Sequence, residues 1–155
     1  MDHFSRGNHP GIFEIDGVKV GFRICFEVRF PEYFRELFLA KAKLCIISFF
    51  DTSEHDNINR YETIKAHLLT RAVENVMPVI SVNSTANHQT APTAVFDIDG
   101  DMVQVAPRGE EQLLIYQHTA PEITWGAKGR IQNSIRALNL LDVKHELKTF
   151  CDSLK

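Results

Sequence analysis

Three short apolar segments alternate along this chain with two segments of helical periodicity, and this alternation limits the fold more than any other feature. The apolar segments span residues 18–25, 44–50 and 78–82. Pro31 can open the first helix, because the N–H that proline lacks has no intrahelical partner there. Apolar side chains recur on one face of this helix, and they do so again in a second helical segment that runs to about residue 75. Strands that alternate with core-facing helices predict a layered α/β domain.

Two Asp-Gly dipeptides predict β-hairpins. A two-residue hairpin turn needs positive φ angles, which an Asp-Gly pair adopts readily. Each dipeptide stands between two runs of strand-forming residues. The turns and the strands that they join are Asp16-Gly17, between 12–15 and 18–25, and Asp99-Gly100, between 94–98 and 102–106.

The remaining elements follow from shorter signals. Asn59 with Glu62 three residues on resembles a capping box, which predicts that Asn59 caps the second helix. A further strand is expected at 113–118. Apolar spacing predicts a last helix around 131–138, followed by a polar end that runs to Lys155.

Length, composition and charge exclude several classes of protein. The chain has 155 residues, 44% of them hydrophobic and 24% charged, which is typical of one globular domain. Its 17 basic and 20 acidic residues give a net charge of −3, so binding to nucleic acid or to an anionic membrane is not expected. The longest apolar segment, 44–50, is far shorter than the roughly 20 residues of a membrane-spanning helix. No secretory signal is visible at the N-terminus, and we expect a cytoplasmic protein.

Metal and disulfide sites are not expected either. Cys25, Cys45 and Cys151 are widely spaced and form no C-x-x-C pair, and the seven histidines form no short ligand pair. Cys45 lies in the middle of an apolar run, where an inert core thiol is expected. Nothing in the chain implies a cofactor.

Cys25 is the strongest candidate for chemistry. It is expected to end the strand 18–25 just before the helix that Pro31 opens, and so to lie at a sheet edge of the kind where α/β proteins bind ligands. The backbone N–H of Phe26 would then be placed to stabilise an oxyanion. Position alone leaves a second interpretation open, because cysteine is also among the most buried residue types.

Three segments stand out in order along the chain: GFRICFEVRFPEYFRELFLAKAKLCIISFF, HLLTRAVENVMPVISVNSTA and TAVFDIDGDMVQVA. Over about residues 11–118 they resemble three motifs of the nitrilase superfamily of carbon–nitrogen hydrolases. These motifs are the family's Cys-Tyr-Asp-x-Arg-Phe-Pro-Glu signature with an Arg in the next helix, its Arg-Ala-x-Glu-Asn helix, and an Asp-x-x-Gly hairpin in 93–106. Phe26 and Glu27 replace the Tyr and Asp of the signature. The matching residues are Cys25, Arg29, Phe30, Pro31, Glu32 and Arg35 in the first motif and Arg71, Ala72, Glu74 and Asn75 in the second.

The resemblance implies a fold, a reaction and an assembly. The fold would be part of the α-β-β-α sandwich of carbon–nitrogen hydrolases, whose subunits pair back to back. Cys25 would attack the carbon of a small amide, nitrile or carbamoyl substrate and form an acyl-enzyme that water releases. Residues 1–155 would be a single domain, N-terminally truncated relative to the family, with 119–155 as a C-terminal tail and helix.

The residues around Cys25 keep two interpretations each. The charged residues of the motifs are expected to form an ion-pair network that fixes the cysteine turn, with direct substrate contact as the alternative. Residues at the ends of the neighbouring strands are expected to line the pocket with Phe26. For Phe50, which ends the apolar run 44–50, a core position is the alternative. The supporting residues are Glu27, Arg29, Glu32, Arg35, Arg71 and Glu74, and the lining residues are Phe50 and Asn83.

The catalytic Glu and Lys of the family lie upstream of the cysteine, and the residues that precede Cys25 contain neither motif. Lys19 would lie roughly 20 Å away along the strand. Glu14 would pair with Lys19 across the hairpin turn and not with Cys25. Glu27 and Glu32 are weaker candidates for the general base.

Three hypotheses arise from this gap. The chain is a hydrolase whose remaining groups lie outside it, or an inactive half-domain that binds a partner, or a half that a separate N-terminal half completes. A half-domain would leave sheet edges and apolar faces uncovered, which favours association. We therefore expect a homo-oligomer or a complex with an N-terminal half.

Overall fold

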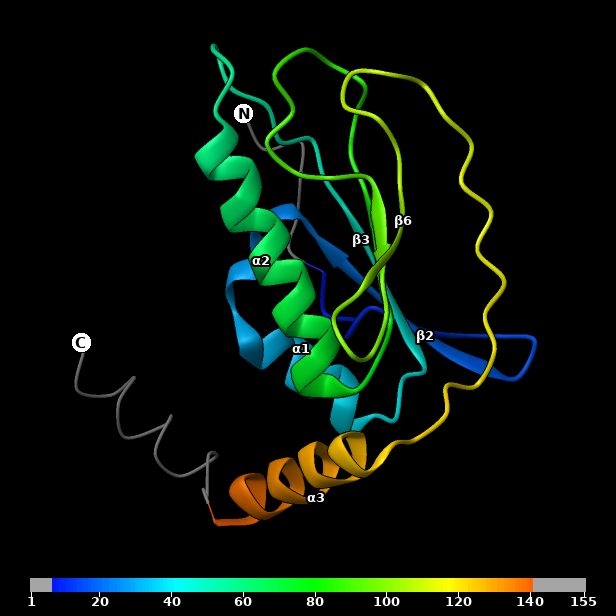
Figure 1. The fold of residues 1–155 in the computed structure, drawn as a ribbon. Helices are drawn as coiled ribbons and strands as arrows, with labels where there is room; N and C mark the ends of the chain where they lie inside the picture. Colours follow the sequence, from blue (N-terminus) through cyan, green and yellow to red (C-terminus); the bar gives the residue numbers. More distant parts are fainter. Residues whose placement is uncertain (1–6, 141–155) are drawn as a thin grey trace, which may run out of the picture. The chain divides into compact units, whose positions relative to one another are not determined.

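The computed structural model describes residues 7–140, and the chain divides after Pro121 into two compact units. The first unit holds a six-stranded mixed sheet with two α-helices, and the second holds one helix, α3 (Trp125–Leu140). The α/β class expected from the sequence is therefore confirmed (Figure 1). A single domain over 1–155 stays a prediction.

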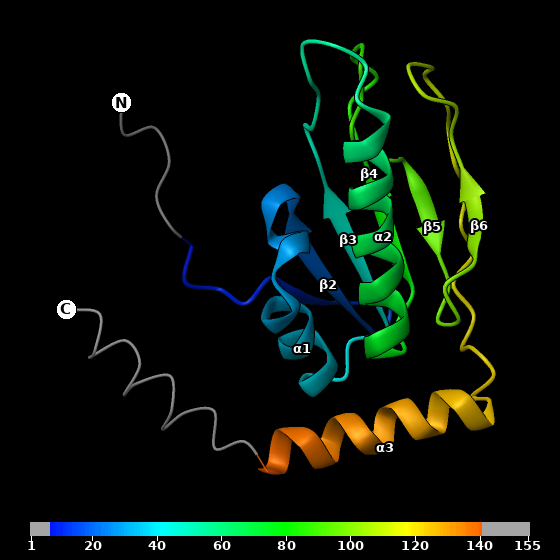
Figure 2. The ribbon, with the colours of Figure 1, turned by 60° about the vertical axis from the view of Figure 1, so that its left-hand side comes forward.

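Parallel strands form the centre of the sheet, whose order is β1-β2-β3-β4-β5-β6. The strands β2, β3 and β4 are parallel, whereas β1, β5 and β6 are antiparallel to their neighbours. Helices α1 and α2 join the parallel strands and cover one face of the sheet (Figure 2). The bounds are β1 (Ile12–Ile15), β2 (Val18–Ile24), a 3-10 helix η1 (Cys25–Arg29), α1 (Pro31–Leu39), β3 (Leu44–Ser48), α2 (Ile58–Asn75), β4 (Val79–Val82), β5 (Ala94–Phe96) and β6 (Met102–Val105).

The turn and helix signals of the sequence explain how the first elements begin. Asp16 and Gly17 have φ angles of 49° and 76°, so the β1–β2 hairpin has the two positive φ angles that an Asp-Gly turn favours. The predicted pairing of Glu14 with Lys19 across this turn is confirmed. Pro31 is the first residue of α1, as its missing N–H predicts.

The cap of α2 corrects one prediction. The helix begins at Ile58 with Asn57 as its N-cap, and Asn59 is already inside it. The side-chain oxygen of Asn57 accepts a hydrogen bond from the N–H of Arg60 at 3.0 Å. Glu62 forms an ion pair with Lys65 instead of completing a capping box at Asn59.

The ends of β2 and β3 correct two further predictions. β2 ends at Ile24, so Cys25 is not the last residue of a strand but the first residue of η1. β3 ends at Ser48, and the two residues up to Phe50 continue beyond it. In both cases the apolar run continues beyond the last residue that pairs with a neighbouring strand, which is Ile24 in β2 and Ser48 in β3.

The strand predicted at 113–118 is absent from the described structure. The carbonyl of Ile115 accepts its hydrogen bond from the side chain of Gln104 on β6 at 2.9 Å, and not from the β6 backbone. The helix expected around 131–138 is confirmed within α3, and the polar end at 141–155 lies outside the described residues. Among residues 7–140, no helix combines the length and apolar character that a bilayer crossing requires.

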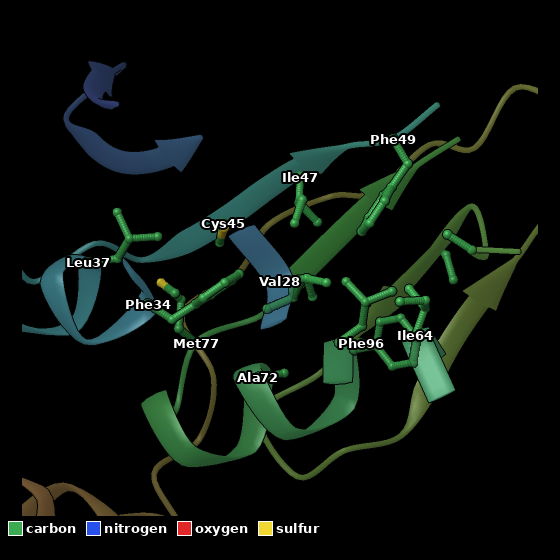
Figure 3. Packing of buried hydrophobic residues seen from close by; sticks show 14 residues of the cluster. Val28, Phe34, Leu37, Cys45, Ile47, Phe49, Ile64, Ala72, Met77 and Phe96 are labelled. Carbon is green, nitrogen blue, oxygen red and sulfur yellow. The ribbon is translucent and has the colours of Figure 1, made fainter. Parts of the chain in front are cut away.

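The hydrophobic core lies between the sheet and the two helices that cover it (Figure 3). Phe34 and Leu37 point into it from α1, and Cys45 and Ile47 meet them from β3. Burial of each such large apolar side chain stabilises the fold by about 1.5–3 kcal/mol. The rest of this cluster includes Val28, Phe49, Ile64, Leu68, Ala72, Met77, Val79, Ala91, Ala94 and Phe96.

The opposite face of the sheet keeps apolar side chains exposed. Side chains alternate along a strand, so Gly21, which faces α1, places Phe22 and Ile24 on the other face. The pairing register puts Phe13 of β1 and Val82 of β4 on that same face. All four side chains are exposed, and the Phe13 and Phe22 rings touch edge to face at 5.4 Å. We call Phe13, Phe22, Ile24 and Val82 the open face.

Gly21 tests the packing of α1 against β2. A Cβ at this position would lie 2.4 Å from Cδ1 of Leu37, whose side chain is fully buried and has little room to move. We expect Gly21→Ala to lower the free energy of unfolding by about 1–3 kcal/mol, and Gly21→Val to lower it more. Urea unfolding measures both. Gly7→Ala is the control, since nothing lies within 4 Å of its Cβ, and equal stability of Gly21→Ala and wild type would contradict this packing.

Candidate active site

The parallel strands bring three predicted site residues to one edge of the sheet. Ile24, Ser48 and Val82 stand at the same level of β2, β3 and β4 in the pairing register. Cys25 comes directly after the first of them, and the chain segments at Phe50 and Asn83 come after the other two. The carboxyl ends of parallel strands are where α/β sheets bind ligands. The candidate site therefore lies at this edge.

Cys25 occupies a sharp turn from strand to helix. Its φ angle is 41°, a left-handed conformation that residues with a side chain rarely adopt. Such a conformation costs about 1–3 kcal/mol and persists only where the surroundings enforce it. The side chain is partly buried and packs against the core cluster. The turn thus places Cys25 at the junction of β2 and η1, at the carboxyl edge of the sheet.

Glu27 ties the two sides of this turn together. Its carboxylate accepts a hydrogen bond from the backbone N–H of Ile24 at 2.6 Å, and its own carbonyl accepts one from Phe30 at 3.0 Å. Cys25 lies within the segment that the first of these bonds closes. The supporting role expected of Glu27 stays a prediction. Phe26, exposed beside it, contacts the Phe30 ring edge to face.

Arg71 holds η1 from the side of α2. Its buried guanidinium donates from Nε to the carbonyl of Val28 at 3.0 Å, and Nη1 forms an ion pair with Glu74 at 2.5 Å. Burial, with the Arg71 and Arg29 charges, lowers the pKa of His67 below its usual value. A buried arginine with carbonyl and carboxylate acceptors fixes its neighbours far better than an exposed ion pair does.

The expected network of charged residues forms only in part. Arg35 donates to the carbonyl of Glu74 at 2.9 Å and so joins the Arg71–Glu74 pair. Arg29 lies over the ring of Phe26, 5.7 Å from its centroid, as a cation–π contact. The side chain of Glu32 is exposed and forms neither a hydrogen bond nor an ion pair with any residue that the structure describes.

Asn83 connects the loops beyond β3 and β4. Its side-chain oxygen accepts hydrogen bonds from the N–H groups of Asp51 and Ser84, at 3.0 and 2.9 Å. Its amide nitrogen donates to the carbonyls of Asp51 and Ala91, at 3.1 and 2.9 Å. An asparagine amide has two donors and two acceptor positions, so all of them are used within the protein. Phe50, next to Asp51, is 75% exposed at the same edge.

Sequence reasoning missed Arg23, a buried arginine two residues before Cys25. It donates to backbone carbonyls and to Glu36, and it shares the helix-facing side of β2 with Gly21. The signal was a charged residue at an inward position of an alternating strand, where a charge persists only with partners. Lys19 is at the other end of β2 and donates to the carbonyl of Ala40 at 3.3 Å.

Cys45 lies in the core, as its sequence position predicts. It is fully buried, and burial raises its pKa from 9.0 to about 12. Within residues 7–140, no group of three or more His, Cys, Asp or Glu side chains is placed to hold a metal ion.

The motifs and the fold lead to one family. The sequence model of the carbon–nitrogen hydrolases matches residues 1–124. The chain belongs to the carbon–nitrogen hydrolase family. The resemblance to the nitrilase superfamily seen in the motifs is confirmed by this match and by solved structures of that superfamily.

Relatives of known name share part of their length with this chain. The 2-oxoglutaramate amidase of Bacillus subtilis is 34% identical over 86 residues, which are 56% of this chain and 31% of that protein. Nit3 of Saccharomyces cerevisiae, from branch 10 of the nitrilase superfamily, has a TM-score of 0.57 at 24% identity, over 69% of this chain and 40% of its own. An amidase variant from Nesterenkonia sp. AN1 has a TM-score of 0.54 at 19% identity, over 68% of this chain and 40% of its own. This chain thus spans well under half the length of these relatives.

The two described cysteines are expected to react very differently. In a Cys151→Ser background, iodoacetamide at pH 8 should alkylate Cys25 and leave Cys45 unmodified, because a thiol of pKa about 12 stays protonated at that pH. Peptide mass spectrometry assigns the modified residue. Full unfolding in guanidinium chloride is the control, in which both residues should react. Modification of Cys45 in the native protein would contradict the packing of β3.

Proposed function

We propose that this chain carries the nucleophile of an amide-hydrolysing enzyme and that Cys25 is this nucleophile. The observation that carries the proposal is the left-handed turn of Cys25 at the carboxyl edge of parallel strands, in a member of the carbon–nitrogen hydrolase family. The Nesterenkonia amidase variant supports it, because the active-site cysteine of that protein carries the acetamide moiety of fluoroacetamide.

The proposed reaction has two covalent steps. The Cys25 sulfur, after giving up its proton to a base, attacks the amide carbon, and a C–S bond forms while the C–N bond breaks. The nitrogen leaves as ammonia or amine with the proton returned to it. Water then attacks the thioester, which releases the acid and restores the thiol. No cofactor is needed for either step.

The Phe26 backbone N–H is proposed as a donor to the oxyanion that forms during both steps. Phe26 is the second residue of η1, and the first N–H groups of a helix have no acceptor within it. A donor of this kind contributes about 10²–10³-fold to the rate. Glu27, Arg71 and Glu74 would support the turn, through the bonds to Ile24 and Val28.

The proposed substrate is a small amide, with a nitrile as the alternative. The amide is favoured by the Bacillus subtilis relative, which is named for the amide 2-oxoglutaramate. Phe50 is proposed as a pocket wall, because it is exposed at the edge that carries Cys25. Asn83 is proposed to set the shape of this wall and not to touch substrate, since its amide is fully engaged.

The general base and the lysine of the family are proposed to come from a second segment. Glu14 and Lys19 pair with each other at the far end of β2, and the carboxylate of Glu27 is bound to Ile24. Loss of a general base typically lowers a rate about 10²–10⁴-fold, so the described residues alone would hydrolyse amides very slowly. The second segment belongs to the same polypeptide or to a separate N-terminal half.

An inactive, partner-binding half-domain is the second candidate function. The observation that favours it is the open face, since exposed apolar patches of this kind mark interaction sites. Both candidate functions involve docking of a second segment, and they differ in whether a reaction follows. Only the hydrolase forms an acyl-enzyme at Cys25.

Replacement of Cys25 tests the proposed reaction. The chain is produced together with the polypeptide encoded directly upstream of it and is given a small amide. We expect Cys25→Ser to lower hydrolysis by about 10³-fold or more and to abolish the acyl-enzyme mass adduct. Cys45→Ala is the matched control and should retain activity, because Cys45 lies in the core. Equal rates for Cys25→Ser and wild type would reject Cys25 as the nucleophile.

A charge on the open face tests the proposed docking. Phe22→Lys should weaken self-association or association with the upstream polypeptide about tenfold or more, because a cation replaces apolar contact area. Sedimentation velocity measures the association. Leu39→Lys is the matched control, since Leu39 is exposed on α1 and lies off the open face. Equal association of both variants and the wild type would reject the open face as an interface.

A further inference from the structure

Arg23 is a buried charged side chain near the candidate site that makes five hydrogen-bond contacts. It is only 4% exposed, although it belongs to a strand whose next residue is exposed. A buried guanidinium is destabilising unless its donors are satisfied. The five hydrogen-bond contacts of Arg23 therefore show which parts of the chain its side chain holds together.

These contacts join three separate segments. Nε and Nη2 donate to the carbonyl of Tyr33 on α1, at 3.1 and 2.7 Å. Nη1 donates to the carbonyl of Pro10, before β1, at 2.8 Å, and to that of Phe22 at 2.9 Å. Nη2 also forms an ion pair with Glu36 at 2.8 Å. Arg23 thus links the chain entering β1, the end of β2 and the first turns of α1.

The position of these links matters because the Cys25 turn lies between two of them. β2 ends one residue after Arg23, and Tyr33 is the third residue of α1. The segment from Cys25 to Phe30 therefore lies between Arg23 on β2 and Tyr33 on α1, which the Arg23 side chain connects. Glu27 and Arg71 hold the interior of the same segment.

We propose that Arg23 is a positioning residue for the nucleophile: it fixes both ends of the Cys25 turn and couples that turn to the chain entering β1 at Pro10. This inference rests on the proposed function of Cys25. It assigns no substrate contact to Arg23, whose donors all face protein acceptors.

The carbonyl contacts carry this role, and the ion pair contributes little to it. Glu36 is 48% exposed, and ion pairs with an exposed partner add little stability. The planar guanidinium reaches Pro10, Phe22 and Tyr33 at once. A lysine ammonium has three donors at a single point and cannot span the three carbonyls.

Gly11 provides an independent way to disturb the same bridge. Its φ is 65°, and its carbonyl accepts a hydrogen bond from the Phe22 N–H at 2.7 Å. A Cβ at this position would lie 2.8 Å from the Phe22 carbonyl oxygen and 3.1 Å from Nη1 of Arg23. Gly11→Ala therefore forces the entering segment away from Arg23 without removing any charge.

The experiment compares Arg23→Lys, Gly11→Ala and Glu36→Gln with wild type in a Cys151→Ser background. Hydrogen exchange measures opening of residues 24–30, and iodoacetamide at pH 7 measures access to Cys25. Cys45 serves as an internal probe of global unfolding, because it reacts only when the core opens. Arg60→Lys is the matched control, an arginine whose partner is Asp51 at 2.6 Å.

We expect Arg23→Lys and Gly11→Ala each to speed exchange across 24–30 and alkylation of Cys25 by about tenfold, with Cys45 unmodified. Glu36→Gln and Arg60→Lys should change either rate less than twofold. If Cys25 and Cys45 become reactive together, or if exchange across 24–30 stays at the wild-type rate, Arg23 only stabilises the fold and the inference is wrong.

The two proposals fail in different ways. These readouts report the position of the turn without any turnover, so they stand whether or not Cys25 forms an acyl-enzyme. Equal amide hydrolysis by Cys25→Ser and wild type would reject the proposed function alone. In the active assembly, Arg23→Lys should lower kcat with little change in KM, because positioning acts on the reacting atom and not on uniform binding.

Discussion

The parallel pairing of β2, β3 and β4 is the constraint on which the candidate site depends. Backbone hydrogen bonds hold Ile24, Ser48 and Val82 at one level, so the residues that come next in each segment must meet at the same edge. Two helical crossovers on one face make this pairing possible, and their apolar faces bury the core that stabilises it. Without that register, the segments at Cys25 and Phe50 would not meet at the same edge of the sheet.

At this edge, the unfavourable backbone of Cys25 is kept in place by a small number of strong contacts. Glu27 binds the backbone before the cysteine, and Arg71 binds the carbonyl of Val28 after it. Both contacts are charge-assisted, and the Arg71 contact is buried, where such bonds are strongest. Arg23 adds a bridge between the two elements that flank the turn. These contacts surround the residue that we propose as the nucleophile, and a nucleophile needs such a fixed backbone.

The two faces of the sheet are unequal, and this difference connects the fold to its relatives. One face is closed by α1 and α2, while the open face leaves Phe22 and Ile24 exposed. Apolar surface of this kind is favourable to cover, because its removal from water stabilises a complex by about 25 cal/mol per Å². The chain spans only 31% of the length of the amidase that it resembles in sequence. The proposed docking of a second segment would cover the open face and would supply part of the length that this chain lacks relative to the amidase.

The sequence by itself determined the α/β class, the β1–β2 hairpin, the start of α1 at Pro31 and the family, because turn chemistry, periodicity and motif spacing are local properties of the chain. It misplaced the cap of α2 by two residues, because Asn57 and not Asn59 accepts the N–H of Arg60. It also predicted a strand at 113–118, where the carbonyl of Ile115 bonds to the side chain of Gln104 instead of to a neighbouring strand. Only the tertiary structure decided that Arg23 is buried, that Asn83 engages its amide with loop backbone and that Glu32 stays unpaired among the described residues. These outcomes depend on contacts between residues far apart in sequence, which no local pattern encodes.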